Sequence, residues 1–337
     1  MEKIKVIIPS DIHHNCQIVT GFLLLKEQGW DVEIENFERK EHPFRDRPVV
    51  LAEYRGKRLL YDLWDGYQAP ELMRECLGWS DFYFKRSFSE KQNRKFFPVD
   101  LGKIQPLGFN YHVTHKKNPI NEPIWKEKLK PLQGRAPDKY FTPEVFEGKA
   151  ERKSEQPKIL FLTRLWDKAP GLLQDELEFI NQTRIEIVRT LRKNYADAFV
   201  GGLNDLPISR QLAPDLIMPA KLTERRKYLK QLHTCDICIG TMGLHASIGW
   251  KTGEYVAAAK AIVHDKLQYA VTGDFAAGKN YLEFTTAREC IDAVDRLVQD
   301  PEKLYRMKQA NEEYYGQYLR PDKLVKNSLE LVDQKIF

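Results

Sequence analysis

The sequence from position 238 to position 263 reads Cys238-Ile-Gly-Thr-Met-Gly-Leu-His-Ala-Ser-Ile-Gly-Trp-Lys-Thr-Gly-Glu-Tyr-Val-Ala-Ala-Ala-Lys-Ala-Ile-Val263. This order predicts a buried strand, a glycine-rich loop, a short helix and a second strand. Loop glycines let the backbone approach a ligand closely, and the start of the helix offers free N–H groups to an anion. We expect Glu254 in the first helical turn, near those donors. The pattern therefore predicts a nucleoside diphosphate site, with amides for the phosphates and a carboxylate for the ribose.

The same stretch resembles the donor-binding motif of group-one glycosyltransferases, which have the GT-B fold. That motif is a glutamate, seven residues, a second glutamate and then Ala-x-Ala-x-Gly-Lys-Pro-Val-Val. Its second half is matched here by Glu254, Ala257, Lys260, Ile262 and Val263. Gly249 matches a glycine of the first half. Ala246 occupies the position of the first glutamate, and Ala261 stands where the family usually has proline, so the match is partial.

A second signal follows the strand expected at 158–162. Arg164 and Lys168 come directly after it, and ligands of open α/β sheets bind beyond the carboxyl ends of the strands. Two cations there would neutralise the diphosphate of a leaving nucleotide without a metal ion. The segment resembles the family's Gly-Arg-Leu-x-x-x-Lys-Gly loop: Arg164 and Leu165 match, Thr163 replaces the glycine, and Lys168 sits one residue early. The alternative is a pair of ordinary surface cations.

The resemblance also implies roles for the loop itself. The family places loop amides, here those around Ile248, against the β-phosphate. Lys251 would add a cation, and His245 would contact the donor sugar, partly replacing the glutamate that is missing at Ala246. A structural histidine is the alternative for His245. The expected donor-site residues are Arg164, Lys168, Gly243, His245, Ser247, Ile248, Gly249, Lys251 and Glu254.

The first half of the chain should hold the acceptor. The loop Ser10-Asp11-Ile12-His13-His14-Asn15 follows a strand expected at 4–9 and opens a helix expected at 16–28, so it would face the cleft. If the reaction inverts the anomeric carbon, the general base that takes the acceptor proton is Asp11, His13 or His14. If it retains, these residues position the acceptor. The structural alternative is that Asp11 or Asn15 caps the helix.

We expect no bound metal and no cofactor. The two histidines beside Asp11 form a metal-ligand pattern, but the sequence offers no obvious distant third ligand. Asp62-Leu-Trp-Asp65 lacks the usual Asp-x-Asp spacing, and enzymes of the GT-B fold generally need no metal. The resemblance instead implies a nucleoside diphosphate sugar as co-substrate, with UDP as the expected nucleotide.

The 337 residues suffice for two domains, and 42% hydrophobic with 30% charged residues is typical of a globular protein. Helices and strands alternate from the start, and a hairpin is expected at 49–54 and 58–63. Prolines and glycines between 131 and 157 interrupt this alternation. Further strands are then expected at 158–162, 198–201, 216–219, 236–240 and 261–264.

The expected fold class is α/β: two Rossmann-like doubly wound domains facing a cleft, which is the GT-B architecture, with helices at the C-terminus. The expected units are an acceptor-binding domain at 1–135, a linker at 136–157, a nucleotide-sugar-binding domain at 158–320, and a C-terminal helix at 321–337 that packs back on the first domain.

The net charge is only +5, but the basic residues are concentrated. Positions 85–130 hold eleven Lys or Arg and four Asp or Glu, with aromatic residues between them. Such a face suits an anionic membrane surface, a phosphorylated or lipid-linked acceptor, or, less favoured, nucleic acid. The alternative is a solvated region with ordinary core aromatics.

The N-terminus is too short and too charged for a signal peptide, and no run reaches the roughly 18 apolar residues of a membrane span. We therefore expect a cytoplasmic protein, with peripheral attachment at the inner face of the membrane as a variant. The five cysteines are odd in number and mostly scattered, which indicates no disulfide framework, and Cys235 and Cys238 are expected in a buried strand.

These observations favour a glycosyltransferase that moves a hexose from a nucleoside diphosphate sugar to a hydroxyl of a glycan or lipid-linked acceptor, as in polysaccharide biosynthesis. Three alternatives remain: a nucleic-acid glucosyltransferase served by the basic region, a sugar-nucleotide epimerase of the same architecture, and a non-catalytic nucleotide-sugar-binding protein, which the alanine at 246 keeps open. A nicotinamide-dependent dehydrogenase is disfavoured, because neither half has G-x-G-x-x-G after its first strand.

Overall fold

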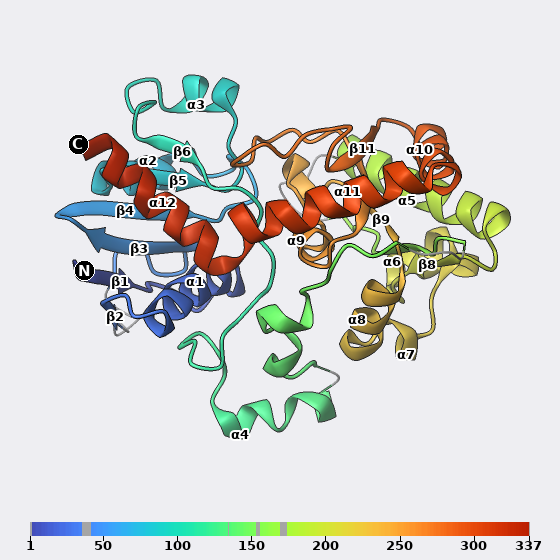
Figure 1. Cartoon of the computed structure of the whole chain (residues 1–337), viewed down its shortest axis with the longest axis horizontal. Coiled ribbons are helices and arrows are strands. Elements are labelled where there is room, and N and C mark those ends of the chain that lie inside the picture. The colour runs from blue at the N-terminus through green and yellow to red at the C-terminus, as the bar shows by residue number, and fades with distance from the viewer. Residues whose placement is uncertain (1, 36–41, 134, 153–155, 169–173, 337) are drawn as a thin grey trace.

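The computed structural model describes residues 2–35, 42–133, 135–152, 156–168 and 174–336. Two β-sheets lie one beyond the other along the long axis of the molecule, and helices flank each of them (Figure 1). The first sheet is built from residues 4–106 and the second from residues 159–284. The α/β class with two doubly wound halves, expected from the sequence, is confirmed.

The first sheet has the strand order β2-β1-β3-β4-β5-β6. The expected βαβ opening is confirmed: β1 (Ile4–Ile7) and β2 (Val32–Glu35) are parallel and joined by helix α1 (Cys16–Glu27). The expected hairpin consists of β3 (Val49–Tyr54) and β4 (Lys57–Asp62). Because β3 runs antiparallel to both β1 and β4, this sheet is mixed. The rest of this half comprises α2 (Pro70–Trp79), β5 (Phe82–Lys85), α3 (Glu90–Phe96) and β6 (Ile104–Pro106).

The second sheet is entirely parallel, with the order β11-β10-β9-β7-β8. Its strands are β7 (Ile159–Thr163), β8 (Phe199–Leu203), β9 (Ile237–Gly240), β10 (Ala261–Asp265) and β11 (Tyr281–Phe284). The helices between them are α5 (Gln174–Asn194), α6 (Pro207–Leu212), α7 (Ala220–Thr223), α8 (Arg225–Thr234) and α9 (Trp250–Ala257). Since β7 and β9 are paired neighbours, the loop with Arg164 and the glycine-rich loop leave the sheet side by side.

One strand prediction in this half is wrong, and one strand was not predicted. The segment 216–219 is not a strand: it follows a 3-10 turn (Pro214–Leu216) and makes only an isolated pairing of Ile217 with Leu203. Prolines at 214 and 219 bracket it, and proline cannot donate to a strand ladder. Strand β11, which the sequence analysis did not predict, pairs with β10 at the edge of the sheet.

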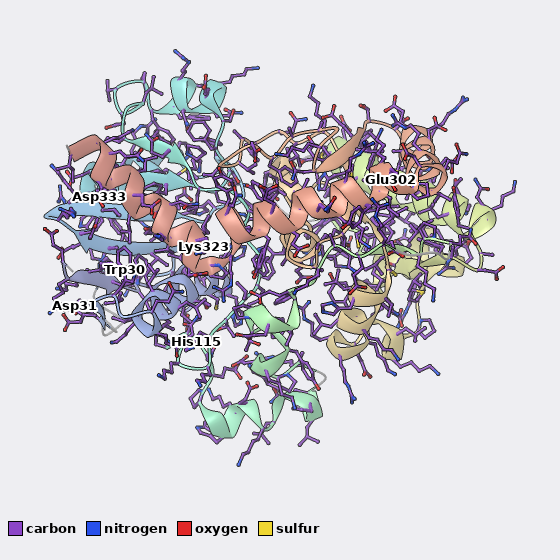
Figure 2. All side chains as sticks on the ribbon, in the orientation of Figure 1. Trp30, Asp31, His115, Glu302, Lys323 and Asp333 are labelled. Carbon is purple, nitrogen blue, oxygen red and sulfur yellow. The ribbon has the colours of Figure 1, made fainter. Side chains whose placement is uncertain are left out.

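The C-terminal helices connect the two halves. After α10 (Ala287–Gln299), helix α11 (Pro301–Tyr314) lies over the second half, a π-helical turn (Tyr315–Leu319) follows, and α12 (Pro321–Ile336) lies over the first. Figure 2 shows Glu302 near the far end of this path and Asp333 at its opposite end, above the first sheet. Val325, Leu329 and Val332 of α12 belong to the core that α1 forms with the first sheet.

The segment between the two sheets includes a short helix, α4 (Ile124–Glu127), and three 3-10 turns (Lys130–Gln133, Asp138–Tyr140 and Pro143–Val145). Phe109 and Tyr111, which precede it, are buried in the core of the second half. Of the aromatic residues in the basic region, Phe97 is also buried, whereas Trp125 is exposed. Both Cys235 and Cys238 are buried, and all five cysteines are free thiols. Among the described helices, none combines the length and apolar character that crossing a bilayer requires.

Candidate functional site

A cavity of about 580 Å³ lies between the two halves of the molecule. The first half contributes His14, Asp65 and Arg86, and the second contributes the ends of β7 and β9 with the start of α9. The lining contains five cationic side chains and two carboxylates, and the cations are Arg86, Arg164, Arg184, Arg225 and Lys251. This excess of positive charge favours an anionic ligand.

The glycines around this cavity have different physical roles. A Cβ on Gly240 would lie 2.3 Å from the His264 ring, and one on Gly253 would lie 3.1 Å from Tyr111, so these two glycines permit close packing. Gly249 has more room, with Thr241 O 3.7 Å from the site of its Cβ, and it lines the cavity. It directly precedes α9, whose start is capped by no side chain of the described residues. The first amides of α9 are therefore available to an anion.

The glycine-rich loop holds two consecutive residues in the left-handed region. His245 has φ 58° and Ala246 has φ 56°, a conformation that costs free energy for residues with a Cβ. The hydroxyl of Tyr269 donates to the His245 carbonyl at 2.8 Å, and the Ala246 N–H donates to Glu176 at 3.4 Å. His245 is not among the lining residues of the cavity, whereas Gly243, Ser247 and Gly249 are. The expected contact of His245 with a donor sugar stays a prediction.

Glu254 lines the cavity, but its surroundings differ from the expectation. Helix α9 begins at Trp250, so Glu254 lies beyond the first turn and the prediction of a first-turn position is wrong. The carboxylate is buried, accepts from the Arg225 guanidinium at 3.0 Å, and accepts from the Tyr228 hydroxyl. Arg225 thus gives the buried Glu254 carboxylate a charge partner, and the oxygens of that carboxylate can accept further hydrogen bonds from a ligand.

Two loops that carry the site are fixed by one buried arginine. Arg184, on α5, donates to the Arg164 carbonyl at 2.6 Å, the Met242 carbonyl at 2.8 Å and the Thr241 hydroxyl at 3.0 Å. Burial lowers the pKa of Arg184 to about 10, so its guanidinium remains charged at neutral pH. Arg184 therefore joins the ends of β7 and β9 and adds positive charge beneath the cavity.

The cations predicted from sequence fall at different places. Arg164 lines the cavity with its guanidinium 3.7 Å from the Trp166 ring centre. Lys251 also lines it and donates from Nζ to the Leu162 carbonyl. Burial lowers the pKa of Lys251 to about 8, with Glu254 opposing the shift. Lys168 is exposed and is not a lining residue of the cavity, so its expected contact with the diphosphate stays a prediction.

Only one of the three expected acceptor-side bases reaches the cavity. His14 lines it, with Nε2 3.9 Å from Asp65 and its ring 4.8 Å from the Trp250 ring. Burial, assisted by the Arg86 charge, lowers the pKa of His14 to about 4 against the pull of Asp65. Asp11 and His13 are exposed outside the lining. The alternative that Asn15 caps α1 is wrong, because its side-chain amide donates instead to the Ser10 carbonyl at 3.2 Å.

The two consecutive cations at the end of β5 have different places: one is buried in the fold and the other lines the cavity. Lys85 is fully buried and pairs with Asp62 at 2.7 Å, so it meets no ligand in the cleft. Arg86 lines the cavity, pairs with Asp65, and donates to the Ile248 carbonyl at 2.8 Å. This last contact ties the first half to the glycine-rich loop. Ile248 itself is buried and is not among the lining residues, so its expected contact with a phosphate stays a prediction.

Three groups outside the cavity offer metal ligands. His13, Cys16 and His112 place one ligand atom each within 4.8 Å of one another. A tetrahedral zinc ion about 2.1–2.3 Å from each ligand would need these atoms about 3.5 Å apart. Pairs at the 4.8 Å limit of this cluster are wider than a zinc site allows.

The sequence matches no protein-family model and no curated protein. Solved structures of glycosyltransferases resemble it. The C-terminal domain of a Francisella tularensis group 1 family glycosyl transferase, LpcC, is 16% identical, with a TM-score of 0.34 over 52% of this chain and 95% of that domain. A Rickettsia africae glycosyltransferase is 14% identical, with a TM-score of 0.42 over 75% of this chain and 63% of the other. Anabaena HepE, solved with UDP, is 11% identical, with a TM-score of 0.46 over 96% of both chains. These values assign no activity to the present chain.

Proposed function

We propose that this protein is a glycosyltransferase that transfers a hexose from a nucleoside diphosphate sugar, with UDP as the nucleotide, to a hydroxyl of a glycan or lipid-linked acceptor. One observation carries the proposal. The cavity combines a helix start without a side-chain cap, five cationic side chains and a charge-compensated buried carboxylate. A nucleoside diphosphate needs these three features: amides and cations for its phosphates, and an acceptor for its ribose hydroxyls.

In this proposal the leaving diphosphate is stabilised by side chains, without a metal ion or another cofactor. Arg164 approaches from the end of β7 and Lys251 from the first turn of α9, so the two cations reach the ligand from two neighbouring loops. Fixed charges aimed at a departing anion lower the barrier, because they need no reorganisation as charge develops. Arg184 holds both loops in register for this role.

The acceptor enters from the side of the first half, where His14 lines the cavity. A pKa of about 4 keeps this imidazole neutral at physiological pH, so it can accept a hydrogen bond from a hydroxyl but is a weak base. A bound diphosphate would raise the pKa of His14, because nearby negative charge favours the imidazolium. In an inverting reaction, His14 is thus the general base, and the bound donor makes it a stronger base by raising its pKa. We place the reaction in the cytoplasm, at or near its membrane face.

The test is a thermal-shift screen of the protein against UDP, GDP, ADP, CMP and their common sugar conjugates, with mass spectrometry for donor hydrolysis. A ligand that binds the folded state must raise the midpoint of unfolding. We expect a selective shift with one nucleotide and slow hydrolysis of its sugar conjugate. Absence of any shift contradicts the donor site, and a shift without turnover on any acceptor supports a non-catalytic binding protein instead.

A further inference from the structure

Large apolar side chains are exposed together at one tip of the molecule. Trp125 of α4 is 62% exposed, Leu129 is 40% exposed and Leu132 is 85% exposed, and all three fall within eight residues. Figure 1 shows α4 projecting below the junction of the two halves, away from both sheets. We call residues 124–133 the α4 tip. Exposed apolar residues gathered in this way are typical of an interaction surface.

The exposed charges of the α4 tip have one sign. Lys126 and Lys128 are exposed, and within the described residues neither lies at ion-pair distance from a carboxylate. The nearby glutamates face other cations: Glu122 pairs with Arg135 at 2.8 Å, and Glu127 pairs with Lys130 at 2.6 Å. The tip therefore presents positive charge around its apolar side chains.

The tip is also internally supported. The ammonium group of Lys130 is buried between Glu127 and Asp138, and the Asp138 N–H donates to Glu127. The segment thus buries a lysine and leaves a tryptophan and two leucines outside. In a loop that faces only water, burying the apolar side chains and exposing the lysine would give the lower free energy. The observed burial therefore favours a binding partner for the exposed apolar side chains.

We propose that the α4 tip docks the protein on an anionic lipid bilayer, with Trp125 and Leu132 in the headgroup region and Lys126 and Lys128 against lipid phosphates. Tryptophan favours that interface and lysines are attracted to its negative potential. Leu129 and Leu132 favour a bilayer over nucleic acid. Aliphatic side chains can insert among lipid hydrocarbon, whereas they bind neither the phosphates nor the stacked base faces of a nucleic acid.

The segments that precede and follow the α4 tip both contact residues of the cavity. His112, which precedes the tip, has its ring 5.6 Å from Trp250, and Phe141, which follows it, lies 4.5 Å from the Arg225 guanidinium. Trp250 and Arg225 both line the cavity. A bilayer held at the tip would therefore deliver a lipid-linked acceptor toward the cavity. This second step rests on the proposed function, whereas the docking itself does not.

The test is co-sedimentation of the full chain with vesicles of phosphatidylcholine and phosphatidylglycerol at 3:1, compared with phosphatidylcholine alone. We expect binding to the anionic vesicles that weakens with added salt. The double variants Trp125→Ser/Leu132→Ser and Lys126→Gln/Lys128→Gln should each bind at least tenfold more weakly. Matched controls are Val99→Ser, which removes a 92% exposed apolar side chain elsewhere, and Lys91→Gln on α3; both should bind like the parent protein.

Three results overturn the proposal. The parent protein does not bind anionic vesicles, or both tip variants bind them as well as the parent does. The third result is that the parent binds a single-stranded oligonucleotide but no vesicles, and the tip variants lose this oligonucleotide binding. Circular dichroism and the nucleotide thermal shift, measured on the same variants, show that they are folded. If vesicles bind but no nucleotide does, the proposed reaction fails while the docking surface stands. If nucleotides bind but vesicles do not, the docking surface fails alone.

Discussion

At Glu254 a single carboxylate is held by Arg225 and Tyr228 and also lines the cavity. Glu254→Gln keeps the volume but removes the charge and one acceptor, so we predict at least tenfold weaker binding of the nucleotide sugar. The midpoint of unfolding should fall as well, because Arg225 loses its buried charge partner. Titration calorimetry measures the affinity. Glu178→Gln, on the exposed face of α5, is the control and should bind as tightly as the parent. Equal affinity of both variants would remove Glu254 from the donor site.

Arg164 is predicted to act on the departing diphosphate. Removing one preorganised charge of this kind costs about 10²-fold in turnover, and a smaller change in donor affinity is expected because the charge develops in the transition state. Arg164→Ala should therefore lower kcat for donor hydrolysis or transfer far more than it raises KM. Arg189→Ala, on the exposed side of α5, should leave both constants unchanged. Parent-like turnover in Arg164→Ala would refute the assignment.

If Lys251 binds the diphosphate as proposed, donor binding should depend on pH. Burial lowers the pKa of Lys251 to about 8 in the unliganded protein, and a bound diphosphate must raise this pKa because it favours the charged amine. Binding therefore takes up a proton at high pH, and we predict that affinity changes little between pH 6.5 and 7 and falls by up to about tenfold per unit above pH 8. Calorimetry with UDP between pH 6.5 and 9 tests this. Lys251→Met should bind weakly with a flat profile, and an unchanged slope in that variant would contradict the prediction.

Sequence reasoning at this scale found the residues that belong to loop motifs and missed those on amphipathic helices. Arg164, Gly249 and Glu254 were identified because strand ends and glycines mark ligand loops. Arg184 and Arg225 were not, because an arginine on a helix such as α5 or α8 has the same sequence pattern as a solvated charge. Only the fold shows that both arginines line the cavity.

Among the elements, the contact of α1 with α12 depends on one glycine. A Cβ on Gly21 would lie 2.3 Å from the Pro321 carbonyl oxygen and 2.6 Å from Val325, so any larger residue forces the two helices apart. We predict that Gly21→Ala lowers the free energy of unfolding by about 1–3 kcal/mol, measured by urea titration. Gly78→Ala in α2 is the matched control, because nothing lies within 4 Å of its added Cβ, and it should be neutral or stabilising by up to about 1 kcal/mol. Equal effects would show that α12 does not pack on α1 as described.

The elements that sequence reasoning predicted well are those with strong local signals. A buried aliphatic run gave β7, and Gly29 after an apolar helix gave the end of α1. The position of β3 between β1 and β4 could not be predicted, because pairing order depends on contacts between distant strands. The segment 216–219 failed for a local reason, since its two bracketing prolines outweigh its apolar pattern.

For the whole molecule, the cleft is shaped by contacts that close the two halves on each other. Arg86 reaches the Ile248 carbonyl, Phe88 pairs with Ala270 through their backbones, and Gly66 packs near His245. All three contacts fall on the glycine-rich loop or on the segment after β10. A ligand bound at this loop would therefore stabilise the closed arrangement as well as its own site.

The same junction should respond to acid. Burial lowers the pKa of His14 to about 4 and of His112 to about 3, whereas in the unfolded chain both return to about 6.5. Below pH 6.5 the unfolded chain binds protons that the folded protein does not, so the free energy of unfolding must fall as pH drops toward 4, by at most about 1.4 kcal/mol per unit for each histidine. Above pH 7 these two groups contribute no slope.

Urea titrations between pH 4.5 and 7.5 measure this acid dependence. His14→Gln and His112→Gln should each flatten the slope below pH 6.5, because each removes one proton-binding difference between the two states. His233→Gln, which replaces an exposed histidine, should keep the parent slope. Carboxylates that titrate in the same pH range are present in all variants, so this control shows their contribution to the slope. If the three variants have the same slope, the two histidines are not buried at the junction, and the closed arrangement of the two halves is not the one that the protein adopts in solution.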